Sequence, residues 1–98
     1  MAVSESYLKK LKQALRLSTG PFDDEVADMI EAARKDLSGA GVAQEKAEDE
    51  EDAAILAAIK SYCRAVFWTG ARADKAEGYY LVQKDELRKR KGYRNESV

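Results

Sequence analysis

Apolar residues recur along this chain at the spacing that places them on one face of a helix. Two such stripes come first: Leu8, Leu11 and Leu15 within residues 4–17, then Val26, Met29, Ile30, Ala33 and Leu37 in a helix that begins near residues 21–24. Charged side chains fill the positions between them, as is typical of helices that pack one face on a core. Ser4 or Ser6 is suited to cap the first helix, and Gly39 and Gly41 lie where the second is expected to end.

The third predicted helix, at residues 50–69, is the most apolar one. Its wide face consists of two adjacent stripes, Ile55, Ile59, Tyr62 and Val66 beside Leu56, Cys63 and Phe67. A face this wide predicts the central helix of a small bundle. The acidic run at residues 48–52 suits the positive N-terminal end of that helix, and a loop is expected at residues 42–51.

The fourth predicted helix, at residues 73–91, carries an apolar cluster. Tyr79, Tyr80, Leu81 and Val82 follow one another and therefore point to all sides of the helix. A helix that is apolar all round is usually contacted all round. In a chain this short, such contacts indicate a second molecule.

Together these patterns predict an all-α fold in a single domain at residues 1–98. We expect a small four-helix bundle with a short first helix and an extended last helix that ends in a basic C-terminal arm at about residues 88–98. A chain of 98 residues forms one domain at most. Hydrophobic residues make up 45% of it, but 16 of them are alanine, so the core is thin and a partner or further copies are expected to complete its stability.

Charge is segregated along the chain although the net charge is only −1. Residues 1–20 carry four bases and one acid, residues 21–59 carry twelve acids and three bases, and residues 60–98 carry ten bases and five acids. Such a pattern fits helices that are solvated on differently charged sides, or a subunit with two complementary faces. For a protein that stacks on copies of itself, the second interpretation is the stronger one.

Several function classes are disfavoured by what the sequence lacks. Histidine is absent, which removes the commonest general base and transition-metal ligand, and there is no P-loop, G-x-S-x-G or other catalytic motif. We therefore expect no enzyme and no cofactor, and no metal at the acidic run, which lacks calcium-loop spacing. The lone Cys63 predicts a buried thiol in a reducing compartment. No apolar run is long enough to span a membrane, and the first ten residues lack the apolar region of a signal peptide.

The basic segment at residues 88–94 is a candidate for nucleic-acid contact, as in a small packaging or regulatory protein. Its Lys and Arg side chains can neutralise phosphates, and Tyr93 can stack on a base. Two other interpretations stay open: a solvated helix end, where bases suit the helix dipole, and an arm that docks on an acidic protein surface. Trp68 either covers the core or anchors an interface. Trp68 and the cluster at residues 79–82 also leave open a small adaptor that binds a host protein.

The order of these elements resembles the head–tail connector (head-completion or adaptor) proteins of long-tailed phages. The segments that carry the resemblance are SYLKKLKQALRLS, FDDEVADMIEAARKDL, SGAG, EEDAAILAAIKSYCRAVFWTG and RKRKGYR. They cover nearly the whole chain, whereas residues 42–48 lack the aromatic or proline-rich stretch of the family. The resemblance implies a virion protein of the head–tail junction, made in the host cytoplasm, that assembles as a ring (dodecameric by resemblance).

The resemblance also implies partners and interface residues. The ring docks on the portal protein, extends the channel through which DNA passes without sequence-specific binding, and presents a surface to the next neck or tail-completion protein. The positions that match the family's portal-binding segment are Leu87, Arg88, Arg90, Tyr93 and Arg94. Subunit contacts are expected at Glu50, Glu51, Asp52, Trp68, Tyr79 and Tyr80. The acids of the second helix and of the run at residues 48–52 would form one face, and Lys9, Lys12, Arg64 or Arg72 would supply the other.

Overall fold

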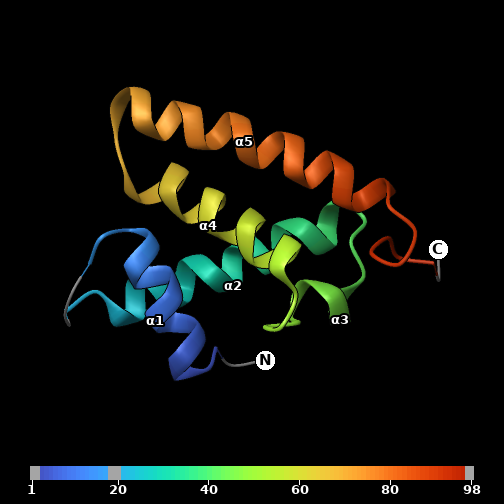
Figure 1. Ribbon diagram of the computed structural model, residues 1–98, viewed down its shortest axis with the longest axis horizontal. Helices are drawn as coiled ribbons and strands as arrows, with labels where there is room; N and C mark the ends of the chain where they lie inside the picture. Colours follow the sequence, from blue (N-terminus) through green and yellow to red (C-terminus); the bar gives the residue numbers. More distant parts are fainter. Residues whose placement is uncertain (1–2, 18–20, 97–98) are drawn as a thin grey trace.

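The computed structural model describes residues 3–17 and 21–96 and folds them into five helices (Figure 1). They are α1 (Glu5–Ala14), α2 (Asp23–Ala40), α3 (Gln44–Ala47), α4 (Ala53–Phe67) and α5 (Gly70–Lys89). The described residues form no strand beyond one isolated β-bridge, which confirms the all-α class. The expected loop at residues 42–51 contains the single turn of α3, so there are five helices where the sequence predicted four.

The starts of α1 and α4 are fixed by side-chain caps. The Ser4 hydroxyl accepts a hydrogen bond from the N–H of Tyr7 (3.2 Å), as the sequence predicted. The Asp52 carboxylate accepts one from the N–H of Ile55 (2.9 Å). Because Asp52 is the cap, α4 begins at Ala53 rather than at residue 50, and most of the acidic run precedes the helix.

α1 ends three residues earlier than predicted because the chain forms a Schellman motif after Ala14. The N–H of Arg16 donates to the carbonyl of Gln13 (3.0 Å), and the N–H of Leu17 donates to that of Lys12 (2.8 Å). Arg16 has φ 64°, a left-handed conformation that costs a non-glycine residue roughly 1–2 kcal/mol. Glycine is the usual residue here, so the sequence gives little warning of this helix end.

α2 continues through Gly39 and ends at Gly41, whose φ is 116°. The N–H of Val42 donates to the carbonyl of Leu37 (3.0 Å), which is again the Schellman pattern. Here the left-handed residue is glycine, and the predicted helix end is confirmed to within a residue or two.

Only Trp68 and Thr69 separate α4 from α5. Gly70 has φ 68° and begins α5, so the last helix starts three residues before the predicted position. A two-residue link makes the two helices an antiparallel hairpin, and they lie side by side in Figure 1.

α4 is the central helix, as its wide apolar face predicts. It packs on α1, α2 and α5, and its Ile55, Ile59 and Cys63 are completely buried. The remaining large side chains of the core are Tyr7, Leu11, Leu15, Val26, Ile30, Leu37, Val42, Tyr80 and Leu87. Cys63 is therefore a core residue, as predicted.

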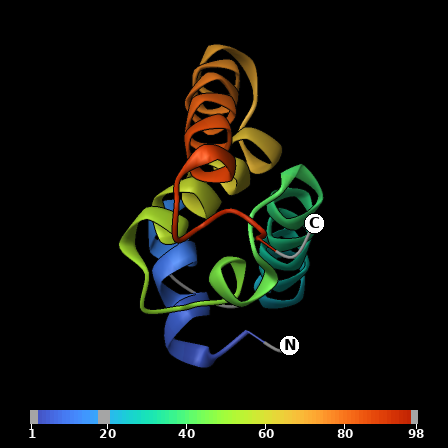
Figure 2. The ribbon, with the colours of Figure 1, turned by 90° about the vertical axis from the view of Figure 1, so that its right-hand side faces the viewer.

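The molecule is flat, with extents of 40 × 30 × 18 Å. Figure 2, turned by 90° from Figure 1, shows α1 (blue) and α2 (teal) on opposite sides of the fold, with α5 beyond α4 as the outermost layer. Most residues of α5 are exposed, because α4 is the main element that covers it.

The chain after α5 turns back onto the end of α2. The N–H of Ala43 donates to the carbonyl of Tyr93, and the N–H of Asn95 donates to that of Gly41, both at 2.7 Å. We call residues 90–96 the C-terminal clasp. These backbone bonds hold the clasp against the turn between α2 and α3.

Tyr93 adds side-chain contacts to the clasp. Its hydroxyl donates to the Asp52 carboxylate (2.8 Å), and this hydrogen bond raises the pKa of Tyr93. The ammonium of Lys46 and the guanidinium of Arg90 lie 5.5 and 5.6 Å from the ring centroid, within cation–π range. The extended arm expected at residues 88–98 is thus not confirmed, since its described part folds back.

Candidate interaction surfaces

The apolar cluster of α5 is divided between the core and the surface. Tyr80 is 4% exposed, whereas Tyr79, Leu81 and Val82 are 58%, 52% and 61% exposed. Consecutive residues of a helix point about 100° apart, so the three exposed side chains lie on different sides of α5. The described chain thus covers the Tyr80 side and leaves the other sides to solvent.

A depression on one edge of the α4–α5 hairpin combines cations with aromatic rings. We call it the Trp68 groove, and it is lined by Ser61, Arg64, Trp68, Arg72, Lys75, Ala76 and Tyr79. The guanidinium carbons of Arg72 and Arg64 lie 4.3 and 5.6 Å from a ring centroid of Trp68, close enough for cation–π attraction. No carboxylate lines the groove, and neither Arg72 nor Lys75 forms an ion pair with a described residue.

The two edges of the hairpin face different helices. On the groove edge, Nε of Arg64 donates to the carbonyl of Ala14 at the end of α1 (3.3 Å). On the opposite edge, Tyr80 and Lys84 both donate to the Asp36 carboxylate of α2, at 2.5 and 3.0 Å. The Trp68 groove therefore lies on the α1 side of the molecule.

The contacts at the α2 edge fix the ionisation of their members. Desolvation opposes ionisation of Asp36, but the hydrogen bonds from Tyr80 and Lys84 outweigh it and hold the pKa of Asp36 below its ordinary value of 3.8. Burial, reinforced by the hydrogen bond to Asp36, raises the pKa of Tyr80 well above its usual range. This edge is a closed internal cluster, and the expected subunit contact at Tyr80 falls on a buried side chain.

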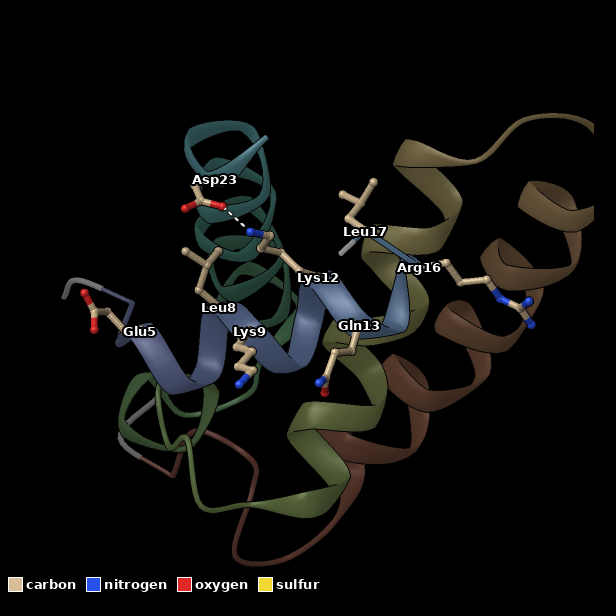
Figure 3. Close-up of a pocket in the computed structure, with 8 residues that line it drawn as sticks. All are labelled: Glu5, Leu8, Lys9, Lys12, Gln13, Arg16, Leu17 and Asp23. Carbon is tan, nitrogen blue, oxygen red and sulfur yellow. Dashed lines mark ion pairs between the residues drawn. The ribbon is translucent and has the colours of Figure 1, made fainter. Parts of the chain in front are cut away.

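An open pocket of about 690 Å³ lies along the outer side of α1 (Figure 3). Lys12 crosses it to pair with Asp23 of α2, with Nζ and Oδ1 2.6 Å apart, as the dashed line in Figure 3 marks. Lys9 and Arg16 also line the pocket, and neither pairs with an acid of the described chain. Lys12, which was expected to pair with an acid of another subunit, thus pairs with Asp23 of its own chain. Lys9 has no such partner among the described residues.

Two of the acids expected at a subunit interface are also engaged internally. Glu50 accepts hydrogen bonds from the N–H and hydroxyl of Ser4 and from Arg34. Desolvation opposes ionisation of Glu50 and Asp52, yet their hydrogen bonds prevail and lower the pKa of each carboxyl. Of the three acids, Glu51 alone is fully exposed.

The residues expected to contact a portal are also held within the chain. Leu87 is 3% exposed and packs in the core, so its side chain is not available at the surface. Arg88 and Lys89 both bind the Asp85 carboxylate, at 2.6 and 3.0 Å. Hydrogen bonds from Lys89 and Arg88 lower the pKa of Asp85.

Arg90, Tyr93 and Arg94 lie in the C-terminal clasp. Nε of Arg94 is 3.1 Å from the Glu96 carboxylate, and Arg90 lies over the ring of Tyr93. The structure therefore brings Arg90, Tyr93 and Arg94 together, but in contacts with neighbouring residues of the same chain.

The chemistry that these surfaces support is binding. Burial raises the pKa of Cys63 to about 12, which keeps this thiol protonated and unreactive. Among the described residues, no group of three or more His, Cys, Asp or Glu side chains is arranged to hold a metal ion. No helix in the described ranges is long and apolar enough to cross a membrane.

Comparisons with known proteins were made at the level of families, sequences and folds. No family model, curated protein or solved structure matches this chain. The resemblance to phage connectors therefore stays a prediction from the sequence.

The acids of the second helix form a further surface, which the sequence reasoning placed on one charged face together with the run at residues 48–52. Asp24, Glu25 and Asp28 of α2 are all exposed and pair with no described residue. We call them the acidic face of α2. The spacing of Asp24 and Asp28, four residues apart and away from the buried Val26, was the signal for a common face.

Proposed function

We propose that this chain is a structural, non-catalytic subunit of a phage head–tail connector. In this role its copies form a ring on the portal at the head–tail junction, extend the DNA channel and offer a surface to the next neck or tail-completion protein. The four long helices act as the small bundle of the subunit. The basic residues at its C-terminal end act as the arm that meets the portal.

The observation that carries this proposal is the unpartnered surface of α5. Tyr79, Leu81 and Val82 are more than half exposed, and Val66 of α4 is 56% exposed as well. Exposed apolar side chains that gather on one element are typical of interaction sites. A ring subunit needs such surfaces on more than one side, because each copy meets two neighbours.

The C-terminal clasp supports a portal contact in a modified form. Arg90 and Arg94 are exposed on a short segment whose main attachments are two backbone hydrogen bonds and the Tyr93–Asp52 contact. We infer that Arg88, Arg90, Tyr93 and Arg94 meet the portal, and that Leu87 stays in the core.

The alternative that residues 88–94 bind DNA has less support, because the basic and aromatic side chains of this segment already have partners within the chain. Arg88 is bound by Asp85, and Arg94 by Glu96, so each cation already has a carboxylate partner. Tyr93, the candidate stacking residue, is tied to Asp52. A small adaptor that binds a host protein through Trp68 and the exposed part of α5 stays as the other alternative.

The test is the solution mass of the purified chain by light scattering over a range of concentration and salt, with negative-stain images of any large species. We expect a discrete multimer with a central hole, formed alone or on added portal rings. The double substitution Leu81→Ser with Val82→Ser should lower the mass of the assembly, because it removes exposed apolar side chains of α5. Lys91→Ser, at an exposed position in the clasp, should leave that mass unchanged. A chain that stays monomeric, ignores portal rings and binds duplex DNA in a salt-dependent way contradicts the proposal and favours the DNA-binding alternative.

A further inference from the structure

We propose that the acidic face of α2 in one copy docks on the Trp68 groove of a second copy. The inference rests on the proposed ring and names the two surfaces that join its subunits. The occupant of the groove is therefore a defined part of this same chain, carrying the carboxylates of Asp24, Glu25 and Asp28.

The two surfaces lie on opposite sides of the molecule. The groove is on the α1 side, where Arg64 reaches the end of α1. Figure 2 shows α1 and α2 on different sides of the fold. Asp24 and Asp28 lie on the side of α2 away from the buried Val26 and Ile30, so the acidic face is turned away from the core and from α4. A front-to-back contact between two different faces is heterologous, and repetition of it generates either a ring or a filament.

The charges of the two surfaces are complementary and otherwise unused. Arg72 and Lys75 in the groove have no anionic partner among the described residues. Lys9 and Arg16 in the neighbouring α1 pocket add positive charge on the same side. Complementary potentials of this kind set the partner and the orientation of an interface.

The groove also has the composition of an interface centre. Trp68 is partly exposed and Tyr79 is 58% exposed, and Trp, Tyr and Arg are the residues most enriched among binding hot spots. Arg72 lies over the Trp68 ring, which leaves its planar N–H groups to bind a carboxylate in a bidentate manner. A carboxylate on Arg72 and apolar contact with Trp68 can thus be satisfied together.

The acidic run at residues 48–52 fits this role less well than the acidic face of α2. Glu50 already accepts hydrogen bonds from Ser4 and Arg34, and Asp52 caps α4. To bind a cation of a neighbouring subunit, either carboxylate must first lose hydrogen bonds within its own chain. Asp24 and Asp28 have no such bonds to lose within residues 3–17 and 21–96.

The experiment is a charge swap on the full-length chain. One variant carries Arg72→Glu with Lys75→Glu, and the other carries Asp24→Lys with Asp28→Lys. All four positions are exposed, and circular dichroism checks that each variant stays folded. The matched control is Asp74→Lys with Glu77→Lys, which reverses the same number of exposed acids on α5.

Self-association is followed by sedimentation at low salt, and docking at the groove by fluorescence. Trp68 is the only tryptophan in the chain, so its emission reports whether the groove is covered. We expect each variant alone to associate at least about tenfold more weakly than the unmodified chain. An equimolar mixture of the two variants should recover association and the emission change, because each swapped face then meets its complement. The control should behave as the unmodified chain does.

Two results with the variants, and a third with the wild-type chain, overturn the docking proposal. One is association of both single variants with unchanged affinity. The other is a mixture that stays as weak as its components, or that associates without a change in Trp68 emission. A wild-type chain that remains monomeric at about millimolar concentration overturns it as well. Binding of that monomer to portal rings would leave the connector function standing, so the two proposals fail separately.

Discussion

Removal of the Tyr80 hydroxyl tests the contact that closes the α2 edge of the hairpin. In Tyr80→Phe the ring keeps its edge-to-face packing on Tyr62, whose centroid is 5.2 Å away, and only the hydrogen bond to Asp36 is lost. A hydrogen bond to a charged group contributes about 1.5–3 kcal/mol. The Asp36 side chain is 42% exposed and keeps its bond to Lys84, so we expect a loss near the lower end, about 1.5 kcal/mol at pH 7.

The assay is urea denaturation followed by circular dichroism, in which a lower midpoint with an unchanged slope indicates a loss of stability alone. Tyr79→Phe is the matched control, because Tyr79 is 58% exposed and its hydroxyl forms no hydrogen bond with a described residue. A change within about 0.5 kcal/mol is expected there. The pKa of Asp36 is lowered in the folded chain. The stability that this ionised carboxylate contributes is therefore present above its unfolded pKa of 3.8 and is lost as the pH falls through its folded pKa.

The difference between Tyr80→Phe and the unmodified chain should accordingly shrink as the pH falls below 3.8 and through the lowered pKa of Asp36, where the folded chain takes up this proton. The reasoning is refuted if Tyr80→Phe and Tyr79→Phe unfold at the same urea concentration at pH 7. A difference that is equally large at pH 7 and pH 3 refutes the role of the carboxylate, even if the hydroxyl itself stabilises the chain.

Three further substitutions or reactions test other parts of the fold. Asp52→Ala removes the acceptor that caps α4 at Ile55 and the acceptor for the Tyr93 hydroxyl. It should lower the stability by about 1–2 kcal/mol and speed hydrogen exchange at the amides that hold the clasp. Unchanged exchange at those amides would show that the Tyr93–Asp52 hydrogen bond does not hold the clasp. Gly41→Ala places its Cβ 3.7 Å from the Cβ of Arg88, an ordinary contact, but requires an alanine to adopt φ 116°, so a loss of about 1 kcal/mol in thermal denaturation is expected. The Cys63 thiol, completely buried and with its pKa raised to about 12 by burial, should react with a disulfide reagent only as fast as the chain unfolds, and a rapid reaction without denaturant would show that the core opens locally.

Helices α1, α2 and α4 could be predicted because each carries a full apolar stripe. The completely buried residues Leu11, Ile30 and Ile59 are the central members of those stripes. Val66 belongs to the same stripe as Ile59 but is 56% exposed, since it lies at the end of α4 beyond the part that the other helices cover. Periodicity shows which side of a helix is apolar, but not where along its length a neighbour ends.

The contacts that define the surfaces could not be predicted in the same way. α3 is four residues long, which is too short to show a period. Glu50 finds Ser4 at a sequence separation of 46, and Tyr93 finds Asp52 at a separation of 41. Such pairs are brought together by tertiary packing alone. No local pattern in the sequence therefore indicates that Glu50, Asp52 and Tyr93 form hydrogen bonds within the chain. Of the two acidic parts expected on one face, the acids at residues 50–52 are for this reason the weaker candidate in our docking proposal, and the acidic face of α2 is the stronger one.

The two-residue link between α4 and α5 and the clasp at the far end of α5 have different consequences for the order of folding. Contacts across the link close very short loops and can form early, whereas the clasp closes a loop of about 50 residues, with a larger entropic cost. We expect the hairpin to belong to the folding nucleus and the clasp to close late. During synthesis, residues 90–96 emerge after every helix that they fasten. The turn between α2 and α3 therefore cannot form its hydrogen bonds to the clasp until residues 93–95 have left the ribosome.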